Sequence, residues 1–167
     1  MVRKLVVIVI LILLLAWSGY RYFRHRIDAE LAAQWLARDC TVTDQDLFEK
    51  GIRDRGEALE PVFIQAFSNG PASAEIDELA ASIDVVYKRR QERIRSGQGY
   101  KEAAGESLSL VNETQLAENN FDFGYRAAAL NGLRIIGRPA GRQLLQRLAA
   151  QDSASPFRYL ATLYLQR

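Results

Sequence analysis

The sequence has little of the side-chain chemistry on which many enzyme sites are built. Cys40 is the only cysteine and His25 the only histidine among 167 residues. One cysteine excludes an internal disulfide and a multi-thiolate zinc site. One histidine, near the N-terminus, excludes Ser-His-Asp or Cys-His catalysis and histidine-ligated metals in the rest of the chain. Because the sequence also lacks a phosphate loop, a dinucleotide fingerprint and a nucleophile elbow, we expect no catalytic residues, no metal and no cofactor.

Proline is scarce as well, with four residues, and no segment alternates apolar and polar residues with period two. The composition is rich in Ala, Leu, Arg, Gln and Glu, which favour helix. The sequence therefore predicts an all-α fold. We expect helices at 27–39, 43–55, 58–68, 73–96, 107–119, 122–136, 139–150 and 155–166.

The net positive charge is confined to the N-terminus. Residues 1–26 contain five basic residues and no acid, although the whole chain carries only +2. The remaining 17 basic residues face 20 acidic ones, so residues 27–167 carry a net charge of −3. Since the basic pI does not reflect a basic domain, we expect no nucleic-acid partner.

An unbroken apolar run, Leu5–Trp17, follows Arg3 and Lys4. If the helix continues to Phe23, residues 2–23 reach ~33 Å at 1.5 Å per residue, enough for the ~30 Å hydrocarbon core. We therefore predict a transmembrane anchor within 1–26. Two alternatives stay open: a signal peptide cleaved before Gly19, and a buried core helix.

The orientation of this anchor depends on basic residues that lie on both of its flanks. The short tail before the apolar run favours a cytoplasmic N-terminus and an exported domain. We predict a single-pass protein of a bacterial inner membrane with its domain on the periplasmic side. Residues 27–43 are expected to form a connecting helix, and 44–167 the domain.

The domain shows an internal match at an offset of 81 residues. The segment Gly51–Gly56 (GIRDRG) aligns with Gly132–Gly137 (GLRIIG), and apolar positions agree downstream. Gly51 and Gly132 fall inside predicted helices, where glycine is unfavourable, which predicts close helix–helix contact. Gly56 and Gly137 fall at helix boundaries, which favours a left-handed conformation at each.

The segment FGYRAAALNGLRIIGRPAGRQLLQRLAAQDSASPFRYLATLYL resembles a unit of the HEAT family of helical repeats. The resemblance covers 44–167 and implies a short α-solenoid of about three helix pairs. These pairs are 44–69, 73–119 and 122–150, closed by a helix from Ser155. The family binds other proteins on its concave face and brings no catalytic residues to this chain.

Two groups of residues are candidates for binding a protein partner. The resemblance places polar residues of the helix 139–150 on the inner side of the stack, and the densest basic run lies near the end of the helix 73–96. The alternative for the basic run is a solvated helix C-terminus, where basic side chains interact favourably with the helix dipole. The candidates are Gln143, Gln146, Arg147, Arg89, Arg90 and Arg93.

We therefore interpret the chain as a non-catalytic, membrane-anchored adaptor that binds a protein partner of unknown identity. An alternative within the partner-binding class is an immunity-type inhibitor of a toxin acting near the membrane. A separate alternative is a structural subunit of a membrane complex. An enzyme using Asp and Glu is a further alternative. It requires paired acids in one cleft, whereas the helical pattern scatters the acids over outer faces.

Overall fold

The computed structural model describes residues 2–37, 45–97, 109–152 and 154–166. Every secondary-structure element in these ranges is a helix, which confirms the all-α prediction. The helices are α1 (Val2–Leu36), α2 (Gln45–Asp54), α3 (Gly56–Asn69), α4 (Ser73–Arg95), α5 (Leu110–Ile136), α6 (Pro139–Ala149) and α7 (Pro156–Leu165).

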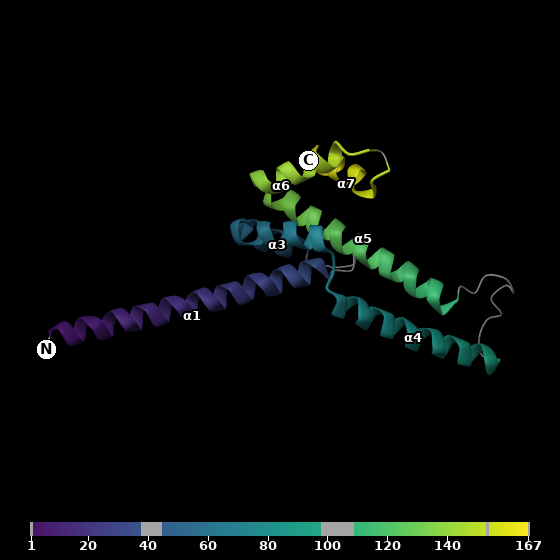
Figure 1. The fold of residues 1–167 in the computed structure, drawn as a ribbon, viewed down its shortest axis with the longest axis horizontal. Helices are drawn as coiled ribbons and strands as arrows, with labels where there is room; N and C mark the ends of the chain where they lie inside the picture. The colour runs from purple at the N-terminus through teal and green to yellow at the C-terminus, as the bar shows by residue number, and fades with distance from the viewer. Residues whose placement is uncertain (1, 38–44, 98–108, 153, 167) are drawn as a thin grey trace.

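Helix α1 joins the predicted anchor and the predicted connecting helix into one element of 35 residues. Its N-terminal part extends away from the other helices (Figure 1), and the side chains of 10–17 are exposed. Within the part of the chain that the structure describes, no helix is both long and apolar enough to cross a membrane. The C-terminal end of α1 is not exposed in this way, because Trp35 and Leu36 are buried in the core.

The core lies where α3 crosses the second half of α5. Its largest fully buried side chains include Leu59 and Phe63 from α3 and Leu130 and Leu133 from α5. Gly132 allows this crossing, since a Cβ atom there would lie 2.5 Å from Cε2 of Phe63. The end of α1 is fixed to the same core, because the indole nitrogen of Trp35 donates a hydrogen bond to the Ala128 carbonyl oxygen at 2.8 Å.

Helix α5 is continuous, so the prediction of separate helices at 107–119 and 122–136 is wrong. The segment between them lacks proline, and Arg126 donates to the carboxylate of Asp122 one turn earlier at 2.9 Å, a pairing that supports an unbroken helix. The division into pairs 73–119 and 122–150 therefore fails. The first half of α5 pairs with α4, and its second half belongs to the core (Figure 1).

Glycine marks the helix boundaries in two different ways. Gly137 ends α5 in the left-handed conformation, with φ of 67°, as predicted. Gly56 was predicted to do the same, but its φ is not positive and it is the first residue of α3. Its role is close packing, since a Cβ atom there would lie 3.0 Å from Cγ2 of Ile136.

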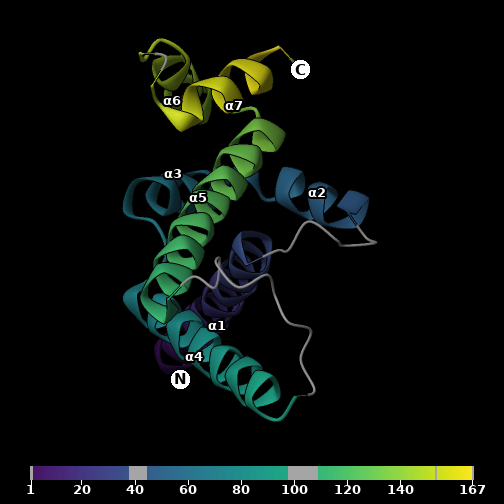
Figure 2. The same cartoon turned by 90° about the vertical axis from the view of Figure 1, so that its right-hand side faces the viewer.

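The packing of successive helices is partly regular. Helix α7 packs against α5 and α6, as α5 packs against α2 and α3. Residues 81 apart also meet, because the backbone nitrogen of Gly141 donates to a carboxylate oxygen of Glu60 at 2.7 Å. Helix α4 is outside this regularity: among the described helices it contacts only α5, and the two form an arm (Figure 2).

Candidate functional site

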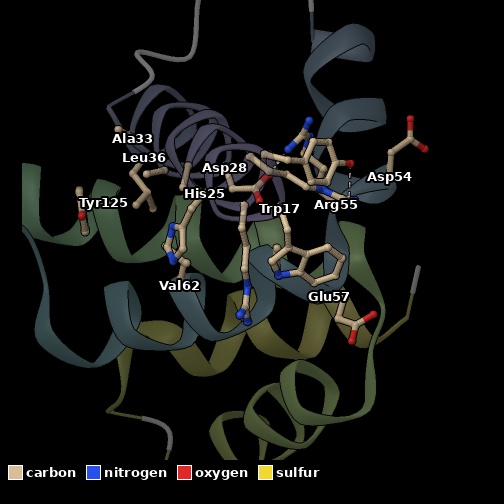
Figure 3. A pocket seen from close by; sticks show the side chains of 16 residues that line it. Trp17, His25, Asp28, Ala33, Leu36, Asp54, Arg55, Glu57, Val62 and Tyr125 are labelled. Carbon is tan, nitrogen blue, oxygen red and sulfur yellow. Dashed lines mark hydrogen bonds and ion pairs between the residues drawn. The ribbon is translucent and has the colours of Figure 1, made fainter. Parts of the chain in front are cut away.

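A cleft of about 800 Å³ lies where α1 leaves the domain (Figure 3). One wall is a face of α1, and the other is formed by α2, the start of α3 and Tyr125 of α5. The α1 wall is aromatic and cationic, because helical spacing brings residues three, four and seven apart onto one face. Its side chains include Trp17, Tyr20, Arg21, Arg24 and His25.

An ion pair joins the two walls of the cleft. Asp28 of α1 accepts a hydrogen bond from the guanidinium of Arg55, which lies between α2 and α3. Asp28 is only 8% exposed, so this pair is shielded from solvent more than a surface ion pair. The contact fixes the α2–α3 boundary against α1 and thereby sets the width of the cleft.

The remaining basic and acidic side chains of the cleft lie on opposite walls. Arg21 and His25 lie on the α1 wall, and Asp54 and Glu57 lie on the opposite wall. Within the described ranges, none of these four side chains pairs with another residue. Arg24 donates a hydrogen bond to the hydroxyl oxygen of Tyr20 on its own helix, at 3.4 Å. The cleft therefore presents cations on one side and carboxylates on the other.

Tyr125 adds a neutral hydroxyl to this site. Burial raises the pKa of Tyr125 above its ordinary value of 10.0, and the nearby carboxylate of Glu75 raises it further. The hydroxyl is therefore protonated at physiological pH. It can act as a hydrogen-bond donor but not as an anion.

A second candidate surface is a groove of about 310 Å³ along the arm formed by α4 and α5. Apolar side chains line it, including Ile83 and Val86 of α4 and Leu116 of α5. Val86 and Leu116 are more than half exposed, and α4 contains no buried residue. An apolar groove between two exposed helices is a common shape of site for binding a partner helix.

The arm is held together by one of the predicted partner-binding residues. Both terminal nitrogens of Arg90 donate to the carboxylate of Glu113, at 2.8 Å and 3.2 Å. The guanidinium of Arg90 is thus occupied within the chain, and its role is to join α4 to α5. Arg89 and Arg93 are exposed on α4.

The other predicted residues lie elsewhere. Gln143, Gln146 and Arg147 are exposed on α6, whose opposite face buries Leu145 and Leu148. Since α6 does not contact α4, the structure does not bring the two predicted groups together. No group of His, Cys, Asp and Glu side chains within the described ranges could hold a metal ion.

Both surfaces contain residues that the sequence did not single out. The cleft had one local signal, a helical face that carries Trp17, Arg24 and Asp28 at seven- and four-residue spacing. The groove had another, the apolar residues Ile83 and Val86, which are three residues apart on the helix that ends in the basic run. Comparisons of the chain with protein-family models, curated proteins and solved structures find no match.

Proposed function

We propose that this chain is a membrane-attached helical adaptor that binds a protein partner. In this proposal the part of α1 at 2–23 enters the membrane, and the helical domain is held next to the membrane surface. The main support is the character of α1, which exposes apolar side chains from Ile10 to Leu15 outside the domain while its other end is built into the core. The basic residues that flank this run fit the same role.

The regular packing of α2–α3, α5–α6 and α7 supports an interpretation of the domain as a short HEAT-like solenoid. In this interpretation α4 and the first half of α5 form an insertion between the first two helix pairs. The insertion contains the exposed apolar groove, so we place the partner on the arm rather than on α6.

The chemistry of the arm indicates the kind of partner. The groove can accept an apolar ridge along one face of a helix, through contacts with Val86 and Leu116. Arg89 and Arg93 are exposed on the same helix and favour acidic residues at the edge of the partner. We therefore propose that an acidic amphipathic helix of another protein occupies the groove.

Photo-cross-linking in native membranes tests this placement. A cross-linking residue introduced at Val86 or at Leu116 of the full-length protein should yield the same adduct. Tyr159 is the control, since it is an exposed residue on α7 and does not line the groove. An adduct that also forms at Tyr159, or different adducts from the two groove positions, would contradict the proposal.

The membrane attachment has a separate test. The full-length protein should stay in the membrane fraction after washing with alkaline carbonate, which removes proteins held by surface contacts alone. Release into the supernatant would show that the proposed anchor is wrong, whatever the cross-linking experiment finds.

A further inference from the structure

The cleft at the base of α1 has a shape and a charge pattern that the adaptor role does not use. We infer that it binds the headgroup of a phospholipid that carries both a phosphate and a primary ammonium group. This inference rests on the proposed membrane attachment, because the lipid must reach the cleft from the membrane surface.

The position of the cleft along α1 fits a headgroup. Its basic residues extend from Arg21 to His25, about 6 Å along a helix at 1.5 Å per residue. They lie beside the end of the proposed anchor at Phe23, and the interfacial layer on each side of the hydrocarbon core is about 5–8 Å thick. Trp17 and Tyr20 are exposed on the turns of α1 just before Arg21, and such side chains favour this interfacial layer.

The charge pattern selects between kinds of headgroup. Arg21 and Arg24 can donate hydrogen bonds to phosphate oxygens, which guanidinium groups bind well. Asp54 and Glu57, on the opposite wall, have no partner among the described residues and can accept hydrogen bonds from an ammonium group. A headgroup with only negative charge would face these two carboxylates and be repelled.

The charged side chains on the two walls of the cleft do not all pair with one another. Arg55 is already paired with Asp28, so it does not pair with Asp54 or Glu57. The buried end of α1 and the Asp28–Arg55 pair fix the two walls relative to each other. A zwitterionic ligand can therefore bridge charges that the chain itself leaves separated, and a volume of about 800 Å³ is in the range of small-ligand sites.

Native mass spectrometry of the full-length protein tests the inference. The protein is reconstituted in vesicles of equal parts phosphatidylethanolamine and phosphatidylglycerol, extracted in mild detergent, and analysed for retained lipid. We expect phosphatidylethanolamine to be retained in preference. Glu57→Gln and Asp54→Asn should each reduce this preference by about tenfold, the effect of losing one charge-assisted hydrogen bond.

Two further variants define the controls. Arg24→Gln should reduce retention of both lipids, because both have a phosphate. Glu92→Gln removes an exposed carboxylate on the arm, outside the cleft, and should leave retention unchanged. Equal retention of the two lipids by the wild type would overturn the inference, and so would a preference that survives Glu57→Gln and Asp54→Asn.

The same preparation separates this inference from the proposal on which it rests. A protein that carbonate strips from the vesicles contradicts the membrane attachment and the headgroup site together. A protein that stays in the vesicles but does not discriminate between the lipids overturns the headgroup site alone.

Discussion

Substitution of Gly132 by alanine probes the tightest helix crossing in the domain. A Cβ atom at this position would lie 2.5 Å, 2.6 Å and 3.0 Å from three ring atoms of Phe63. Phe63 is fully buried, so its ring has no open space into which it can move. The added methyl group must therefore push α3 and α5 apart.

The expected size of the effect follows from two opposing contributions. Overpacking in a dense core costs about 1–3 kcal/mol, whereas replacing a helical glycine by alanine favours the folded state by about 1 kcal/mol. We expect Gly132→Ala to lower the free energy of unfolding by about 1 kcal/mol, a decrease of about 2–4 °C in Tm for a chain of this size.

Gly51→Ala provides the matched control at the position 81 residues earlier. A Cβ atom there would lie 3.5 Å from Cδ2 of Leu31, an ordinary contact. The variant should therefore keep the helix-propensity gain of up to about 1 kcal/mol and become more stable. This corrects the expectation that close helix–helix contact explains the glycine at both positions, since only Gly132 is packed too tightly for a Cβ atom.

Thermal unfolding of the two full-length variants in detergent, followed by circular dichroism, checks the difference in sign. A double-mutant cycle with Phe63→Leu should show a coupling of about 0.5–3 kcal/mol with Gly132→Ala, because the two side chains share one space. Equal stabilisation by both alanines, with no coupling to Phe63→Leu, would refute the reasoning.

Three other predictions concern polar contacts. Asp28→Asn should lower the free energy of unfolding by about 1–2 kcal/mol, since Arg55 loses a shielded counter-charge; an unchanged Tm would contradict this. Glu113→Gln weakens the clamp with Arg90, so hydrogen exchange in α4 should accelerate while exchange in α3 stays the same; equal changes in both helices would argue against a separable arm. Tyr125 has a pKa raised above 10.0 by folding, so its stabilising contribution is complete below pH 10.0 and is lost as the pH rises through the folded-state pKa. The stability of the wild type relative to Tyr125→Phe should therefore fall above pH 10.0, and parallel stability curves would contradict the assignment.

The helix ends that the sequence predicted correctly are those with a local chemical cause. Gly70 and Gly137 adopt positive φ values, which side-chain-bearing residues rarely do, and Pro139 begins a helix where its missing N–H is not needed. The continuity of α5 could not be predicted from local sequence, because it depends partly on a contact with another helix. Its middle is stabilised partly by Arg126, which also donates to the carbonyl oxygen of Phe67 in α3, a contact between residues 59 apart.

The candidate sites depend even more on contacts between distant residues. The basic run of α4 was visible in the sequence, but the engagement of Arg90 by Glu113 depends on how α4 and α5 pair. The cleft exists because Asp28 and Arg55, which are 27 residues apart, meet at the edge of the core. No local sequence pattern predicts the contact between Asp28 and Arg55, so the cleft could be identified only in the structure.

The depth of Trp17 in a bilayer tests the membrane attachment most directly. The chain has two tryptophans, of which Trp17 is 64% exposed on α1 and Trp35 is 4% exposed in the core. In vesicles that contain brominated lipids, the fluorescence of the wild-type protein should be quenched in part, because Trp17 lies among the lipids and Trp35 does not. The variant Trp17→Phe should lose this quenching and keep the emission of Trp35. Wild-type fluorescence that brominated lipids leave unchanged, or equal quenching in the variant, would contradict the attachment of this protein to the membrane through α1.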